Sequence, residues 1–237
     1  MVPARPALTE AEYWRGYDII RNDVNAAMVG CYAHRTIVEL VSGNRPLWER
    51  LNRNGEFWRI NAFSLQGMMF IVLARIFDPN PGLHSIYKVL YATTACPGVF
   101  SKASLRARKV SITSAPWPAG LLDDFVQAAW EPTIQDLRKL RKALSPHKEK
   151  FDRIYKPIRD QIAHHIFTDE AVVEDLYSKT QKTDIDEILC FLHSMIRAIW
   201  EIGYNGREPN LAGDNYGFAG RVAEIRKNTE RFITQLP

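Results

Sequence analysis

Apolar residues recur at i, i+3, i+4 and i+7 in segment after segment of this chain, and no other feature constrains its fold as strongly. This spacing places apolar side chains on one face of an α-helix, whereas strands alternate with a period of two. The sequence contains no strand–helix alternation, no glycine-rich phosphate loop, no internal repeat and no low-complexity tract. We therefore predict one all-α domain over 1–237, a helical bundle with additional kinked and short helices.

Local signals mark where the helices begin and end. Thr9 followed by Glu12 is a capping-box pattern that opens a long helix, and Gly43-Asn44 closes it. The core of the bundle is expected at about 10–205 and the C-terminal helix at about 218–236. The expected helices cover 8–44, 46–53, 56–77, 85–95, 119–144, 146–167, 169–180, 184–204 and 218–236.

Prolines interrupt this pattern in three places. Pro132 predicts a kink inside the helix over 119–144, and Ser145-Pro146 predicts an N-cap followed by a first helical residue. Residues 97–118 are the least helical in pattern and include "RKVSITSAPWP". Its two prolines predict a loop there, although a short extended piece fits the same residues.

Cysteine usage and hydropathy indicate a cytoplasmic protein. Cys31, Cys96 and Cys190 are odd in number and far apart, as free thiols in a reducing compartment are. The N-terminal residues contain no apolar signal-peptide core. The longest apolar stretch, 67–74, is far shorter than the about 20 residues that span a bilayer, so we expect a buried helix segment and no membrane partner.

The formal charge of +4 permits an acidic partner such as RNA without requiring one. Lysine and arginine cluster at 101–109 and at 136–150. Either run is explained by a solvated helix face. The alternative is that both runs form a groove that follows the phosphates of a bound RNA.

The segment "KPIRDQIAHHIF", 156–167, combines charged and titratable residues on a predicted helix. Phe151, Ile154, Tyr155, Ile158 and Ile162 form its expected core stripe. Arg159 lies beside this stripe. His164 follows at about 140° around the helix axis, and Asp160 precedes His164 by one turn, within hydrogen-bonding reach.

These side chains suit RNA cleavage without a metal ion. A histidine titrates near neutral pH and can take the proton of the 2′-hydroxyl, while an arginine stabilises charge on the phosphoryl oxygens. Only His164 and His165 are spaced closely enough to suggest a metal site. Adjacent helical residues diverge by about 100°, so we expect no metal and no cofactor.

A straight helix cannot aim Arg159 and His164 into one narrow pocket, because they diverge. Two copies of the helix packed across a two-fold axis can place four groups around one cleft. The sequence therefore predicts a homodimer through the flank that carries Arg159 and Ala163, where alanine permits close approach.

The stretch "RDQIAH", Arg159 to His164, resembles the signature of the HEPN superfamily, helical proteins common in prokaryotic defence systems. In that signature four to six residues separate an arginine from a histidine, and a polar residue, here Asp160, follows the arginine. The long helices, the helix end "ARIFDPNPG" and the segment "RDQIAHH" together resemble the U-type abortive-infection (Abi) branch over about 10–205. The resemblance implies a HEPN-like bundle and a dimeric, metal-independent endoribonuclease of a defence or toxin-type system. Arg159 and His164 would be catalytic and Asp160 supporting, with His165 an alternative to His164.

Two other hypotheses stay open. The first is a catalytically silent HEPN-like module that binds RNA, a nucleotide or a partner protein, and the second is a structural helical protein in which 159–165 is a charged cap. RNA, a second copy of the chain, and an antitoxin or nucleotidyltransferase are the expected partners. Of the remaining histidines, we expect His34 and His193 to be structural and His84 and His147 to be exposed.

Overall fold

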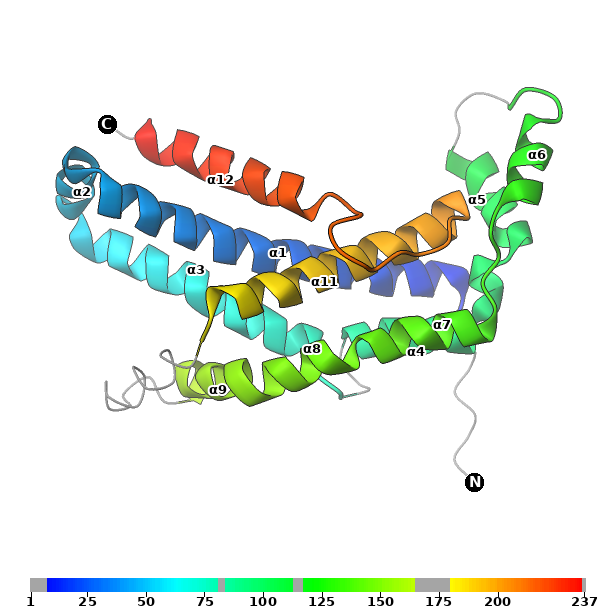
Figure 1. Cartoon of the computed structure of the whole chain (residues 1–237), viewed down its shortest axis with the longest axis horizontal. Coiled ribbons are helices and arrows are strands. Elements are labelled where there is room, and N and C mark those ends of the chain that lie inside the picture. Colours follow the sequence, from blue (N-terminus) through cyan, green and yellow to red (C-terminus); the bar gives the residue numbers. More distant parts are fainter. Residues whose placement is uncertain (1–7, 81–83, 113–116, 165–179, 236–237) are drawn as a thin grey trace.

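The computed structural model describes residues 8–80, 84–112, 117–164 and 180–235, and these ranges are helical with no strand (Figure 1). The all-α prediction is thus confirmed for this part of the chain. Most of the helix predicted over 169–180 lies outside the described residues.

The first and longest helix, α1 (Glu10–Gly43), lies at the centre of the bundle. It packs against α3 (Gly55–Ile76), α11 (Lys182–Trp200) and α12 (Phe218–Thr234), which surround it (Figure 1). A Cβ on Gly30 of α1 would lie 2.8 Å from the backbone oxygen of Leu65 in α3, so glycine permits this close helix contact.

The predicted capping box begins α1. The Thr9 hydroxyl accepts a hydrogen bond from the Glu12 N–H at 3.2 Å, and the Glu12 carboxylate accepts one from the Thr9 N–H at 2.8 Å. A second cap starts α2 (Arg45–Asn52), where Asn44 Oδ1 accepts from the Leu47 N–H at 3.0 Å. The capping box was predicted, whereas the Asn44 cap was not, and α2 begins one residue before the predicted start at Pro46.

The helix α3 is, among the described residues, the one long and apolar enough to cross a membrane. In the structure it packs along α1, yet only part of its surface is covered. The prediction that 67–74 is a buried segment holds for most of its residues, whereas Met68 and Ile71 are exposed.

The loop predicted over 97–118 is wrong for 97–112, whereas 113–116 lie outside the described residues and 117–118 are not helical. After α4 (Ile86–Ala95), a 3-10 turn at Pro97–Phe100 leads into α5 (Lys102–Ile112). The Ser101 hydroxyl accepts a hydrogen bond from the Ser104 N–H at 3.2 Å and so supports the start of α5.

The single kinked helix predicted over 119–144 is also wrong, because α6 (Leu121–Ala128) and α7 (Ile134–Ala143) are separate helices. The chain between them is extended at Ala129, and the N–H of Trp130 donates to the Gly206 oxygen at 2.7 Å. A new capping box of Thr133 with Asp136 then starts α7.

The chain from α7 to α9 forms one long rod of successive helices, which we call the 134–164 rod (Figure 1). Ser145 is not an N-cap as predicted, because Leu144 keeps helical dihedrals and accepts from the Lys148 N–H. The rod continues through α8 (Ser145–Lys150) and the π-turn η2 (Phe151–Tyr155) into α9 (Lys156–His164).

The π-turn η2 lies directly before Pro157. The Lys156 N–H donates to the Phe151 oxygen five residues back, which widens the turn. Proline lacks an N–H and crowds the carbonyl four residues before it, so a widened turn accommodates Pro157 without breaking the helix. Of the predicted core stripe, Phe151, Tyr155 and Ile158 are buried and Ile154 is half-buried, whereas the Ile162 side chain lies outside the described part of the chain.

Candidate functional site

The segment that carries the predicted catalytic residues is α9, and it brings Arg159 and Asp160 together. Arg159 Nε lies 2.7 Å from Asp160 Oδ1, in an ion pair whose N–H is not aligned for a hydrogen bond. The Arg159 side chain is 28% exposed and that of Asp160 44%. Asp160 therefore holds the guanidinium by its Nε edge at a partly open position.

The two predicted histidines cannot be placed beside this pair. His164 is the last residue of α9, but its side chain is not among those the structure describes, and His165 lies outside the described residues. The convergence of Arg159 with His164, and the hydrogen bond expected between Asp160 and His164, stay predictions.

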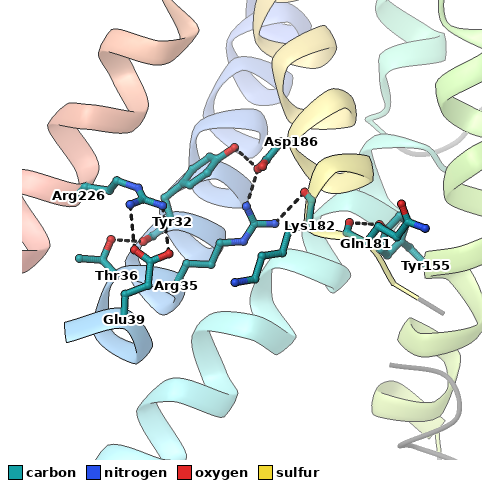
Figure 2. A network of polar contacts seen from close by, with 9 residues as sticks. All are labelled: Tyr32, Arg35, Thr36, Glu39, Tyr155, Gln181, Lys182, Asp186 and Arg226. Atoms are coloured by element: carbon teal, nitrogen blue, oxygen red, sulfur yellow. Dashed lines mark hydrogen bonds and ion pairs between the residues drawn. The ribbon is translucent and has the colours of Figure 1, made fainter. Parts of the chain in front are cut away.

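Tyr155, one turn before Arg159, anchors this part of the rod. Its ring stacks on Phe70 of α3 with 6.1 Å between centroids and 23° between planes. Its hydroxyl donates to the backbone oxygen of Gln181 at 3.2 Å, at the start of α11 (Figure 2). These contacts fix the direction in which α9 leaves the bundle core.

A cavity of about 290 Å³ lies beside Tyr155, between α1, α3, η2 and the start of α11, and we call it the Tyr155 cavity. Met69 and Phe70 give it an apolar wall, and His34, Arg35 and Lys182 contribute polar groups. Such a combination, mostly apolar with a few polar groups, is typical of small-ligand sites.

The charge of Arg35 beside this cavity is already neutralised. Its Nη1 lies 2.6 Å from Asp186 Oδ1, the same oxygen that accepts the Tyr32 hydroxyl at 2.6 Å, and its Nη2 donates to the Lys182 oxygen at 3.2 Å (Figure 2). This network ties α1 to α11. Arg35 is therefore a structural cation rather than a free ligand group.

Burial sets the protonation of two other groups that line the Tyr155 cavity. Burial, with the Arg35 charge as a smaller cause, lowers the pKa of His34, so the imidazole is neutral at neutral pH. Burial raises the pKa of the Cys31 thiol to about 12, which keeps it protonated and unreactive. His34 can exchange a proton, whereas Cys31 cannot serve as a thiolate nucleophile.

The basic run at 101–109 is not a free phosphate-binding surface. Arg106 pairs with Asp123, and the Lys102 amine donates to a backbone oxygen of α6 at 2.6 Å. Arg108 is buried, ion-pairs with Glu10 and donates to the Gly203 oxygen. These cations hold helices together.

The run at 136–150 is only partly neutralised. Lys139, Lys148 and Lys150 pair with carboxylates. Arg138, Arg141 and Lys142 form no ion pair with any residue in the described ranges. Of the two runs, this one retains exposed cations for a partner.

His147 differs from its predicted setting, and His34 has a neighbour that the sequence did not predict. His34, expected to be structural, lines the Tyr155 cavity. His147, expected to be exposed, stacks on Phe191 with 3.8 Å between ring centroids. The neighbouring Arg35 is the sequence signal for the position of His34. The burial of His147 against Phe191 is apparent only from the tertiary packing.

No three histidine, cysteine, aspartate or glutamate side chains gather as metal ligands within the described ranges. Compared with protein-family models, with curated proteins and with solved structures, the chain has no match.

Proposed function

We propose that this chain is a metal-independent endoribonuclease of a prokaryotic defence or toxin-type system, in which Arg159 and His164 act on the scissile phosphodiester. The observation that supports it is the Arg159–Asp160 pair on α9. Asp160 holds the Nε edge, so the outer Nη groups of a partly exposed guanidinium are available to a phosphate. The role of His164 follows from its place on the same helix and from the HEPN resemblance.

The proposed reaction needs no group from outside the protein and its substrate. A histidine takes the 2′-hydroxyl proton, the 2′-oxygen forms a bond to phosphorus, and the bond from phosphorus to the 5′-oxygen breaks. The leaving oxygen takes up a proton, which gives a 2′,3′-cyclic phosphate and a 5′-hydroxyl. Arg159 stabilises the charge that grows on the phosphoryl oxygens.

The site is proposed to be completed by a second copy of the chain. Helix geometry in the sequence places Ala163 on the flank proposed to face the partner, so Ala163→Arg should separate the protomers and abolish cleavage while helical content is kept. Sedimentation analysis combined with a cleavage assay tests this. A monomer that cleaves RNA at the full rate would refute the shared cleft but not the ribonuclease itself.

The decisive experiment is cleavage of single-stranded RNA in excess EDTA. We expect cleavage by the wild type and by Arg106→Ala, a control in which an exposed arginine is removed from α5. Arg159→Ala and His164→Ala should each lower the rate of cleavage by at least about a hundredfold, which is the effect of one general base or one charge-stabilising group. His165→Ala shows which histidine acts, and cleavage unaffected by Arg159→Ala would refute the proposal.

The Tyr155 cavity favours a second candidate, a catalytically silent module that binds a nucleotide. The cavity combines an apolar wall with the neutral His34 and the Lys182 amine, which suit a base and a phosphate. Retention of nucleotide or RNA without cleavage would select this candidate. Absence of any nucleic-acid affinity at low salt would leave a purely structural role.

A further inference from the structure

A second hollow lies between α4 and α7. These two helices pack against each other at the α7 end of the 134–164 rod (Figure 1). The volume of the hollow is about 220 Å³, and we call it the Tyr91 hollow. Tyr87, Lys88 and Tyr91 of α4 line it from one side and Arg141 of α7 from the other. Two cations and two aromatic rings therefore meet at one surface depression.

Neither cation of the Tyr91 hollow is neutralised. The side chains of Lys88 and Arg141 make no ion pair and no hydrogen bond with any residue that the structure describes. On the same rod, Lys139, Lys148 and Lys150 each pair with a carboxylate. Unpaired cations beside a hollow produce a positive potential that attracts an anion.

The aromatic residues add a surface for a planar group. Tyr91 is 63% exposed, so a face of its ring is open to solvent. Burial and the nearby Asp152 charge raise the pKa of Tyr87, so its hydroxyl stays protonated and adds no negative charge. Exposed rings next to cations are the elements with which proteins bind single-stranded nucleic acid.

The start of α4 adds donors at the same place. Ser85, the N-cap, is 1% exposed, and its hydroxyl makes no capping bond and no hydrogen bond to another described residue. Ser85 lines the Tyr91 hollow as well as the adjoining hollow beside Arg15 and His84. First-turn N–H groups of a helix lack intrahelical acceptors, which favours an anion there.

Exposed cations also connect this hollow with Arg159. Arg153 and Lys156 lie between them on the rod and form no ion pair with any residue in the described ranges. The 18 residues from Arg141 to Arg159 span about 27 Å of helix. The acid Glu149 is exposed on this stretch, whereas Asp152 is neutralised by Lys148.

We infer that the Tyr91 hollow binds one nucleotide of a single-stranded RNA, with the base on Tyr91 and its phosphate at Lys88 and Arg141. The strand then follows the 134–164 rod past Lys156 to Arg159. The second part rests on the proposed function, since it assigns the far end of the strand to the cleavage site. Binding at the hollow does not depend on cleavage.

The test measures RNA binding by His164→Ala protein, in which cleavage is blocked. The probes are a fluorescein-labelled oligouridylate of about 12 nucleotides, a length that single-strand sites cover, and a labelled dinucleotide. Tyr91→Ala should weaken binding of the long probe about tenfold through lost stacking. Lys88→Gln combined with Arg141→Gln should lower the slope of log affinity against log salt by about 0.7, as expected for the loss of one phosphate contact to a single strand.

Arg106→Gln, which removes a cation on α5, is the matched control and should leave affinity and slope unchanged. The dinucleotide should lose affinity in Tyr91→Ala but not in Arg159→Gln, whereas the long probe should respond to both. The inference would be overturned if Tyr91→Ala, Tyr91→Leu and the unsubstituted His164→Ala protein bound the RNA probes with equal affinity. An unchanged salt slope in the Lys88/Arg141 double variant would overturn it as well. RNA binding at the hollow together with no cleavage by the wild type would refute the proposed function and leave this site standing.

Discussion

Replacing Arg108 by alanine tests whether the basic run at 101–109 holds the fold together. The guanidinium donates from Nε and Nη2 to the Gly203 oxygen at 3.0 and 2.8 Å, and it ion-pairs with Glu10. It also lies over the rings of Trp14 and Tyr204, at 5.4 and 5.6 Å from their centroids. One side chain thus joins α5 to α1 and to the π-helical turn η3 (Glu201–Asn205) that follows α11.

The loss of unfolding free energy expected for Arg108→Ala follows from these contacts. An unsatisfied Gly203 carbonyl costs about 1–3 kcal/mol, and the lost ring contacts cost about 1 kcal/mol. The Glu10 carboxylate is partly exposed, so its ion pair adds less than about 1 kcal/mol. Arg108→Ala should therefore lower the free energy of unfolding by about 3 kcal/mol, most of it from the unsatisfied Gly203 carbonyl.

Urea unfolding followed by circular dichroism measures this loss. Arg106→Ala is the control, because the Arg106–Asp123 pair is exposed and contributes less than about 1 kcal/mol. Arg108→Lys keeps the charge but not the planar fork, and should fall between wild type and Arg108→Ala. Equal losses for Arg108→Ala and Arg106→Ala would refute the reasoning.

Other substitutions test packing and protonation. A Cβ on Gly203 would lie 2.3 Å from the Trp14 ring, so Gly203→Ala should destabilise by about 1–3 kcal/mol. Gly16→Ala, which meets open space inside a helix, should instead stabilise by about 0.5–1 kcal/mol; thermal unfolding of both variants decides, and equal melting temperatures would contradict the packing argument. Burial lowers the pKa of His147 in the folded state. As the pH falls, this histidine is therefore protonated in the unfolded chain before it is protonated in the folded one. The free energy of unfolding should consequently fall as the pH drops below about 6.5. His147→Phe, which can keep the stack on Phe191, should make that fall shallower, and an identical pH profile would show that His147 does not contribute.

The fold was predictable where local signals and tertiary structure agree. The Thr9–Glu12 capping box and the stop at Gly43-Asn44 mark α1 from sequence alone. The helix α5 was missed because the prolines after it suggested a loop. Its stability comes from Arg108, whose bond partners are about a hundred residues away in sequence and leave no local pattern.

From the sequence, only those parts of the candidate site that are formed by residues close together in the chain could be predicted. Asp160 was expected to support the site by a hydrogen bond to His164, which stays a prediction, and in the structure it forms an ion pair with its neighbour Arg159. The Tyr155 cavity and the Tyr91 hollow each combine residues of separate helices, such as Lys88 with Arg141. No spacing rule links such residues, so only the packed structure shows them together.

The π-turn at Phe151–Tyr155 lets the rod hold one residue more than an uninterrupted α-helix without changing the direction of Arg159. In its wide turn the Lys156 N–H bonds to the Phe151 oxygen, so Lys156 takes the place that an α-helix gives to the fourth residue after Phe151. Deleting a single residue within the turn would restore an ordinary α-turn and leave Arg159 on the same side of the rod. A one-residue deletion within α8 would instead rotate everything beyond it by about 100°. The turn is therefore the place on this rod where one codon can be lost without re-aiming the arginine, and an alignment with an uninterrupted helix requires a one-residue gap there.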